Sequence, residues 1–266
     1  MILTFREKFI NSQMFSHLMK DKIAISMDKD LLELIDSKID NVTIRSRSQA
    51  IEIFVRKGLG FETIETAVIM IKGDQQELVM QNKTSLITKQ IQHLEKFGID
   101  SVIILTQPSK RISEFEAHMK TVSNSAIIKI IDLKGNAKSL YAIKDLLKTN
   151  FVVVSGDVFN EFDLKKMIQK HKNQDKLVTL GLMTVKDLHR NYGLVKLDGD
   201  AVISFEEREK VPPNSIVNAG TYIFKPEIFH LFNSETVSLE REIFPKISGI
   251  GQMIGFFTMG EYVHLK

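Results

Sequence analysis

Short apolar runs of strand length alternate with segments of helical periodicity over much of the chain, and this alternation restricts the fold more than any other feature. The strand patterns span residues 66–71, 101–106 and 151–155, and the helical patterns span residues 85–97 and 137–147. Strands that alternate with amphipathic helices predict a Rossmann-like, doubly wound α/β fold. Ligands of such folds bind at the carboxyl ends of the strands, where the sequence places Asp157.

The first sixty residues follow a different pattern. Residues 22–28 alternate between apolar and polar side chains, which is typical of a half-buried strand, and two segments of helical spacing follow. Ser46 and Gln49 have the spacing of a capping box at the start of the second helix. One strand and two helices cannot bury a core alone, and a lone strand has two unpaired edges. We therefore expect this module to form a homodimer, or a higher oligomer, through residues 22–60.

In this order the strand, the helices and the Ser-Arg-Ser cap resemble the ribbon-helix-helix family of DNA-binding proteins. The resemblance implies that a two-stranded ribbon enters the major groove and that the second helix binds a phosphate at its N-terminus. The implied DNA-binding residues are Lys22, Ala24 and Ser26 on the ribbon and Arg45, Ser46, Arg47 and Ser48 at the helix. The alternative is a helical dimerisation module without a role in DNA binding.

Composition excludes several classes of protein. The 266 residues contain no cysteine, which rules out disulfides, thiolate metal sites and cysteine nucleophiles. No apolar run approaches the roughly 20 residues that span a bilayer, and residues 1–21 lack the apolar core of a signal peptide. We expect a cytoplasmic protein without membrane contact, in which residues 1–21 form an extension. The net charge of +3 is too small to indicate nucleic-acid binding by itself.

Eight short motifs follow in order along residues 61–266, and together they resemble the sugar-phosphate nucleotidyltransferases. Those enzymes join a nucleoside triphosphate to a sugar phosphate and release pyrophosphate. The resemblance implies a mixed-sheet nucleotidyltransferase fold for this domain. The motifs are Ala67–Met70, Phe97–Ile99, Gly135–Leu140, Val154–Asp157, Tyr192–Val195, Ser204–Arg208, Asn218–Gly220 and Ser238–Pro245.

The resemblance also implies roles for particular residues. Those near the nucleotide base are Gly135, Asn136 and Ala137, and those at the metal position are Gly156 and Asp157, of which Asp157 would bind Mg²⁺. Those in the sugar pocket are Tyr192, Gly193, Glu206, Glu207, Asn218, Ala219 and Gly220. We expect a small nucleotide or sugar ligand among these residues.

Three departures from the family pattern affect phosphate and metal binding. Residues 71–78 retain one glycine where the family has a glycine-rich loop, and they carry Asp74 and Glu77, two carboxylates that would repel a triphosphate in a site of low dielectric. The following phosphate-contacting stretch is shortened. His264 takes the position of a second metal-binding aspartate, and histidine is a poor ligand for Mg²⁺. These losses predict a pseudoenzyme without catalytic residues, in which Mg²⁺ binds only if activity persists.

Two functions are consistent with these patterns, besides a purely structural role of the larger domain. The first is a DNA-binding transcription regulator whose degenerate nucleotidyltransferase-like domain senses a nucleotide, a sugar phosphate or a nucleotide sugar. The second is an active sugar-phosphate nucleotidyltransferase that carries a DNA-binding or dimerisation module. The first is our main expectation, because the changes are concentrated in residues 71–78 and at His264, whereas the base and sugar segments persist.

Overall fold

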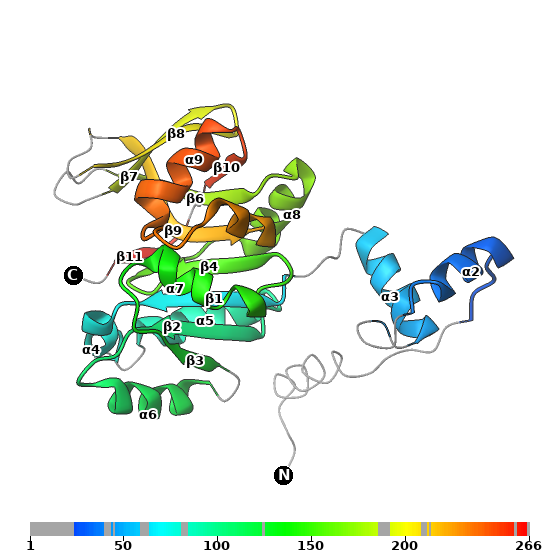
Figure 1. Ribbon diagram of the computed structural model, residues 1–266, viewed down its shortest axis with the longest axis horizontal. Helices are drawn as coiled ribbons and strands as arrows, with labels where there is room; N and C mark the ends of the chain where they lie inside the picture. The colour runs from blue at the N-terminus through cyan, green and yellow to red at the C-terminus, as the bar shows by residue number, and fades with distance from the viewer. Residues whose placement is uncertain are drawn as a thin grey trace, which may run out of the picture. The chain divides into compact units, whose positions relative to one another are not determined.

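The computed structural model describes residues 24–39, 44, 46–58, 64–80, 85–123, 126–185, 192–208, 212, 214–257 and 260–264. The chain separates into two compact units, Met1–Glu62 and Thr63–Lys266. Figure 1 shows helices α2 and α3 in the first unit and a large sheet in the second. The domain boundaries expected after residues 21 and 60 both lie outside the described residues.

A nine-stranded mixed sheet forms the centre of the larger unit, in the order β3-β2-β1-β4-β9-β6-β10-β8-β7. Strands β3, β2, β1 and β4 are mutually parallel, whereas β9 runs antiparallel to β4 and β6. A separate two-stranded sheet pairs β5 with β11. The strands are β1 (Thr66–Ile71), β2 (Ser101–Thr106), β3 (Ile127–Ile130), β4 (Phe151–Ser155), β5 (Val158–Asn160), β6 (Val178–Val185), β7 (Tyr192–Asp198), β8 (Ala201–Arg208), β9 (Ser215–Phe224), β10 (Met253–Phe257) and β11 (Tyr262–His264).

Helices of several kinds connect these strands. The α-helices are α4 (Gln76–Met80), α5 (Leu86–Lys96), α6 (Ile112–Val122), α7 (Asn136–Ala142), α8 (Leu164–Gln174) and α9 (Phe244–Gly249). The 3-10 helices are η1 (Gly73–Gln75), η2 (Lys144–Leu146) and η3 (Pro226–Leu231), and η4 (Leu239–Ile243) is a π-helix.

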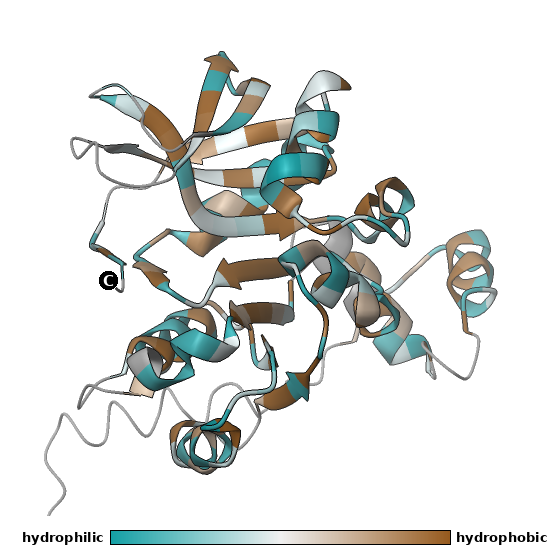
Figure 2. Cartoon of the chain, turned by 60° about the vertical axis from the view of Figure 1, so that its left-hand side comes forward, coloured by the Kyte–Doolittle hydropathy of each residue, from teal (hydrophilic) through white to brown (hydrophobic). Residues whose placement is uncertain are grey.

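Two hydrophobic cores lie on opposite faces of the sheet, because successive side chains of a strand point to opposite faces. Along β1, Ala67, Ile69 and Ile71 belong to the core that includes α5, α6 and α8. Val68 belongs to the other core, which includes α7 and α9. Figure 2 shows largely apolar strands between helices that each have an apolar and a polar side. The doubly covered α/β sheet expected from the sequence is confirmed.

The expected elements around the parallel strands agree closely with the structure. The strands at residues 66–71, 101–106 and 151–155 are confirmed as β1, β2 and β4. Helix α5 begins after Ser85, whose hydroxyl accepts a hydrogen bond from the backbone N–H of Thr88 at 3.3 Å. The helix expected over residues 137–147 is shorter, since α7 ends at Ala142 and the chain continues as η2.

The smaller unit contains helices α2 (Lys29–Asp36) and α3 (Arg47–Gly58). Among its described residues only Ile35 and Ala50 are buried apolar residues, whereas five large apolar side chains are exposed. The exposed side chains are those of Ile25, Leu31, Leu34, Phe54 and Val55. The strand expected over residues 22–28 is not formed at residues 24–28, because no second strand pairs with it here, and residues 22 and 23 lie outside the described set.

Candidate active site

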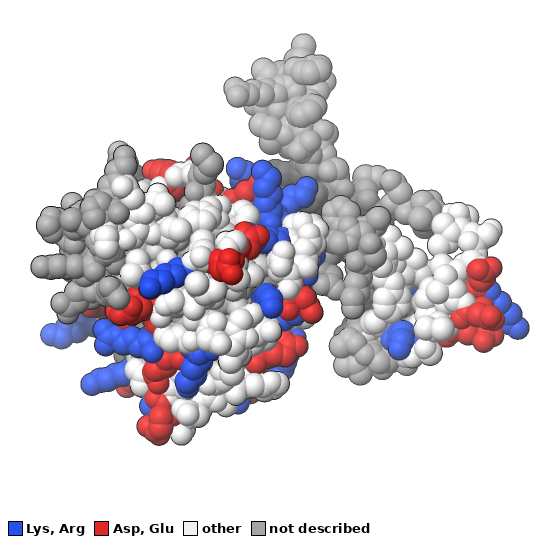
Figure 3. All heavy atoms as spheres, turned by 90° about the horizontal axis from the view of Figure 1, so that it is seen from above, with Lys and Arg blue, Asp and Glu red and all other residues white. Residues whose placement is uncertain are grey.

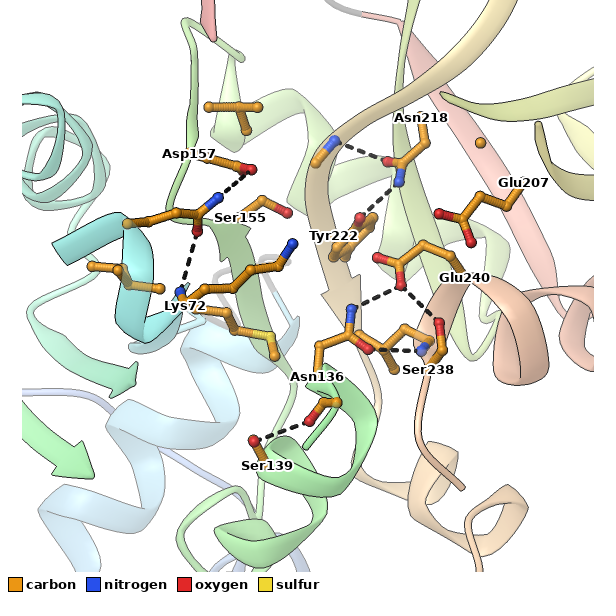
Figure 4. Close-up of a pocket in the computed structure, with 18 of the residues that line it drawn as sticks. Lys72, Asn136, Ser139, Ser155, Asp157, Glu207, Asn218, Tyr222, Ser238 and Glu240 are labelled. Carbon is orange, nitrogen blue, oxygen red and sulfur yellow. Dashed lines mark hydrogen bonds between the residues drawn. The ribbon is translucent and has the colours of Figure 1, made fainter. Parts of the chain in front are cut away.

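A cavity of about 1420 Å³ opens at the carboxyl ends of β1, β2 and β4, which contribute Ile71, Thr106 and Ser155 to its wall. Figure 4 shows polar side chains converging on it from several elements. Nine of the twelve residues predicted to bind a ligand line this cavity: Gly135, Asn136, Asp157, Tyr192, Gly193, Glu207, Asn218, Ala219 and Gly220. Segments that are far apart in the sequence therefore form one site.

The other three predicted ligand residues do not line the cavity. Ala137 and Gly156 are buried in the wall behind it. Glu206 is exposed, and it lies next to Glu207, which does face the cavity. Adjacent residues of a strand point to opposite faces, so only one of this pair can reach the cavity. Their binding roles stay predictions.

Two glycines of the site adopt backbone conformations that other residues rarely adopt. Gly135 has a φ of 99°, and a Cβ atom there would lie 2.2 Å from the carbonyl oxygen of Val237. Gly220 has a φ of 76°, and its Cβ would lie 2.7 Å from a methyl group of Val158. Glycine is required at both positions because no Cβ can be accommodated. The sequence motifs around these glycines thus have a steric basis.

Asp157 occupies the turn between β4 and β5. The turn is fixed to β1, because the backbone N–H of Gly156 donates to the carbonyl oxygen of Met70 at 2.7 Å. Asp157 Oδ2 accepts a hydrogen bond from Gln75 Nε2 at 3.0 Å, and Oδ1 makes no hydrogen bond with a described residue. Mg²⁺ commonly binds one or two carboxylates together with substrate phosphates and water. The arrangement around Asp157 Oδ1 fits such an ion, although no three His, Cys, Asp or Glu side chains gather into a metal site among the described residues.

The segment after β1 turns its carboxylates away from the cavity. Lys72 and Gln75 line the cavity, whereas Asp74 and Glu77 are exposed and outside its lining. Glu77 Oε1 lies 3.6 Å from a guanidinium nitrogen of Arg111. The expectation that both carboxylates repel a triphosphate within the site is therefore wrong, because the short 3-10 turn of η1 directs Gln75 inward and Asp74 outward.

The Asn136 side chain makes two hydrogen bonds at the N-terminus of α7. Its amide nitrogen donates to Glu240 Oε2 at 2.8 Å, and its amide oxygen accepts from the backbone N–H of Leu239 at 2.9 Å. The hydroxyl of Ser238 also donates to Glu240 Oε2, at 3.2 Å. Asn136 therefore orients Glu240 toward the cavity, as Figure 4 shows, and each of its two polar atoms already has one partner.

Glu242 stabilises the loop that carries these residues. Its Oε2 accepts hydrogen bonds from the backbone N–H groups of Val237 and Ser238, both at 2.8 Å. The hydrogen bond from Ser238, and then that from Val237, lowers the pKa of the Glu242 carboxyl below its usual value, because both stabilise the charged form. A charged Glu242 thus holds the loop against the cavity.

The opposite wall combines an ion pair with the half-buried amide of Asn218. Glu207 Oε2 accepts from Arg241 Nε at 2.6 Å, which joins β8 to η4. Asn218 donates to the hydroxyl of Tyr222 at 2.7 Å and accepts from the backbone N–H of Gly220 at 2.9 Å. Burial raises the pKa of Tyr222 far above its usual range, so this hydroxyl stays neutral.

Several lining residues were missing from the sequence-based set. Three cations line the cavity, Lys72, Lys134 and Arg241, together with the carboxylates Glu240 and Glu242. Arg241 and the two carboxylates lie within the Ser238–Pro245 motif, so the motif itself was the signal that could have identified them. Tyr262 and His264 of β11 also line the cavity, and His264 pairs in register with Val158 beside Asp157.

The DNA-binding residues stay predictions, and the structure shows that one of them, Arg47, is bound by another side chain. Arg47 donates two hydrogen bonds to Asp36, at 2.7 and 2.5 Å, so its guanidinium is held by α2. This contact raises the pKa of Arg47 and lowers that of Asp36. Ala24, Ser26, Ser46 and Ser48 are exposed, and Lys22 and Arg45 lie outside the described residues. Figure 3 shows charges of both signs interspersed on one face of the molecule.

The fold and the cavity define an α/β domain with a polar site at the carboxyl edge of its sheet. Residues 71–250 match the nucleotidyl transferase family, and the chain belongs to this family. None of the described helices is long and apolar enough to cross a membrane.

Curated relatives of the chain are named mannose-1-phosphate guanylyltransferases. The putative enzyme of Sulfolobus acidocaldarius is 34% identical over 101 residues, which are 38% of this chain and 27% of that protein. The catalytic subunit beta from Xenopus tropicalis is 26% identical over 190 residues, which are 68% of this chain and 52% of that protein. The chain thus spans from about a quarter to about half of these relatives' length.

Solved structures share the fold of the larger unit. HddC from Yersinia pseudotuberculosis, complexed with GMP-PN, has a TM-score of 0.64 at 21% identity and covers 76% of this chain and 94% of its own. A putative glucose-1-phosphate thymidylyltransferase from Bacillus anthracis has a TM-score of 0.62 at 17% identity, with 75% and 89% covered. The nucleotidyltransferase fold expected from the sequence is confirmed.

These findings correct the main functional expectation. A DNA-binding transcription regulator with a degenerate sensory domain is contradicted by relatives that are named as transferases and by the family match. The physical source of the error is the segment after β1. Asp74 and Glu77 were expected inside the phosphate site, and both lie outside it.

Proposed function

We propose that the larger unit transfers a nucleotidyl group from a nucleoside triphosphate to a sugar 1-phosphate and releases pyrophosphate. A phosphate oxygen of the sugar phosphate bonds to the α-phosphorus, while the bond from the α-phosphorus to the oxygen that bridges to the β-phosphate breaks. The observation that carries the proposal is the placement of Asp157 in one cavity with the Gly135 and Asn218 segments. The names of the relatives make GTP and mannose 1-phosphate the first pair to test.

Asp157 is the residue that would hold Mg²⁺, which would neutralise and orient the reacting phosphates when bound. The hydrogen bond from Gln75 occupies one oxygen of this carboxylate and leaves the other without a partner among the described residues. Gln75 is itself held, since its amide oxygen accepts from the backbone N–H of Lys72 at 3.2 Å. The chain therefore prepares Asp157 in one orientation before substrate arrives.

Lys72 marks one side of the cavity as a place for a phosphate group. Figure 4 shows the side chain of Lys72 extending into the space between Asp157 and Glu240. The ammonium group of Lys72 can bind a phosphate oxygen at this place, because lysine binds phosphate as a point charge. The carboxylates of Glu207 and Glu240 can accept hydrogen bonds from sugar hydroxyls at the other wall. The site thus separates a phosphate-binding part from a sugar-binding part.

The smaller unit is proposed to pair with the same unit of a second chain. Its described residues bury two apolar side chains and expose five large ones, including Ile25, Leu34 and Val55. Among the described residues, two buried apolar side chains cannot offset the conformational entropy that is lost on folding. Burial of each exposed side chain against a second copy contributes about 1.5–3 kcal/mol. Self-association therefore supports folding of this unit.

The test is pyrophosphate release by the full chain with Mg²⁺, each common nucleoside triphosphate and a panel of hexose 1-phosphates. We expect at least one pair to react above the enzyme-free rate. Asp157→Asn should lower that rate at least about a hundredfold, or ~2.7 kcal/mol in activation free energy. Asp145→Asn, an exposed residue outside the cavity, is the matched control and should keep the full rate. No release with any pair, or equal rates for both variants, would contradict the proposal.

A further inference from the structure

We infer that Gln90, Asn160 and Thr221 enclose one structural water molecule behind the active site, and that this cluster positions the Asp157 turn. The three residues line a second, small cavity of about 20 Å³. A cavity holds a water molecule when it offers roughly 10–15 Å³ or more and two to four polar partners. The cavity is large enough for one water and too small for any substrate.

Two buried oxygens in this wall make no hydrogen bond within the described chain. They are Gln90 Oε1 and Asn160 Oδ1, on residues that are 3% and 6% exposed. An unpaired buried acceptor costs roughly 1–3 kcal/mol, and both residues line one small cavity, so a single donor between them would remove both costs. Water has two hydrogens and can donate to both oxygens at once.

The amide orientations are determined by the other contacts of these side chains. Gln90 Nε2 lies 2.9 Å from the carbonyl oxygen of Ser155 and 2.5 Å from that of Val158. Asn160 Nδ2 lies 2.5 Å from the carbonyl oxygen of Ala219. Each nitrogen faces carbonyl acceptors, so an amide flip would place oxygen against oxygen. The amide oxygens are therefore the atoms left without a partner, on two residues that both line the small cavity.

Thr221 completes the set of partners for the water. It is 4% exposed and lines the same cavity, and its position on β9 is in register with Val154 of β4. The hydroxyl of threonine can donate to the oxygen of the water, while the water donates to the two amides. Three hydrogen bonds are the usual number for a buried water.

Gln90 and Asn160 hydrogen-bond to backbone carbonyls of the active-site wall. Ser155 and Val158, whose carbonyls Gln90 holds, flank the turn that carries Asp157. Asn160 holds Ala219, which lies beside Asn218 in the cavity wall. The enclosed water joins these two supports, so it couples the turn at Asp157 to strand β9. This positioning role rests on the proposed function, whereas the water site does not.

The first test is a crystal structure of the full chain at a resolution that shows ordered water. We expect a density peak 2.7–3.2 Å from both Gln90 Oε1 and Asn160 Oδ1. A cavity without a peak, or a structure in which the two side chains bond to other partners, overturns the water site. This result does not depend on turnover, so it separates the inference from the proposed function.

The second test measures positioning. Gln90→Met should raise the Mg²⁺ concentration for half-maximal rate about tenfold or more, as loss of a group that orients a metal ligand does. It should also increase hydrogen exchange at residues 155–160 and 218–221, with β2 unchanged. Gln169→Met, at an exposed glutamine of α8, is the matched control and should change neither quantity. If Gln90→Met left both the Mg²⁺ requirement and the hydrogen exchange at residues 155–160 and 218–221 unchanged, the positioning role would be refuted.

A milder variant covers the case in which Gln90→Met does not fold. Thr221→Val removes the hydroxyl and keeps the shape, and Thr221→Ser keeps the hydroxyl. One hydrogen bond corresponds to a two- to tenfold effect. The Mg²⁺ requirement should rise by that factor in the valine variant and return toward the original value in the serine variant. Equal behaviour of both variants would count against the water-mediated coupling.

Discussion

Gly135→Ala should destabilise the larger unit more than the same substitution at a described glycine whose Cβ position has no atom within 4 Å. Gly135 combines a φ of 99° and a ψ of 143° with a Cβ position 2.2 Å from the Val237 carbonyl oxygen. The backbone conformation costs an alanine about 1–3 kcal/mol. Relief of the clash displaces the Val237 segment and breaks the hydrogen bond from the Ala137 N–H to that oxygen, for about 1 kcal/mol.

The sum is about 2–4 kcal/mol, which corresponds to a fall in Tm of about 4–16 °C for a unit of this size. Equilibrium urea unfolding, followed by circular dichroism, measures it. Gly199→Ala is the matched control, because Gly199 also has a positive φ of 56° but no atom lies within 4 Å of its Cβ position. That variant should lose only about 1 kcal/mol. A loss at Gly135 no larger than the loss at Gly199 would refute the steric argument.

Three further changes test separate parts of the account. Gln75→Leu removes the hydrogen bond to Asp157 Oδ2 and should raise the Mg²⁺ requirement about tenfold; an unchanged requirement in a rate titration would show that Gln75 does not orient the carboxylate. Burial lowers the pKa of His171 to about 4 in the folded chain. Between pH 6.5 and 4 the unfolded chain therefore binds more protons than the folded chain. The free energy of unfolding should fall by roughly 3 kcal/mol as pH decreases through this range. His171→Gln should flatten that slope in urea titrations, and a slope equal to that of the original chain would contradict the assignment. Leu34→Glu should weaken self-association at least tenfold in sedimentation velocity, whereas the exposed Glu33→Gln should not, and a monomeric original chain would refute pairing.

The parallel half of the fold could be predicted from the sequence because its signals are local. The strands at residues 66–71, 101–106 and 151–155 are continuous apolar runs, buried on both faces of the sheet. The other half depends on distant pairing. Strand β9 runs between β4 and β6 through antiparallel contacts, and no periodicity within residues 215–224 specifies those neighbours.

The candidate site shows the same division. Gly135 and Gly220 could be anticipated, since their motifs require conformations that only glycine adopts readily. The orientation of the segment after β1 could not, because one turn of 3-10 helix decides whether Asp74 or Gln75 faces the cavity. The hydrogen bonds from Arg47 to Asp36 could not be predicted either. The two residues are eleven positions apart in the sequence, and their contact depends on how α2 and α3 pack.

The most direct measurement follows the α-phosphate of the nucleotide. The full chain is incubated with Mg²⁺, a hexose 1-phosphate and a nucleoside triphosphate that carries a radioactive α-phosphate, and the products are separated. The account predicts label in a nucleotide sugar, formed in proportion to the released pyrophosphate and lowered at least about a hundredfold in Asp157→Asn. Label that stays in the triphosphate, or that appears only in the nucleoside monophosphate or diphosphate, would contradict nucleotidyl transfer.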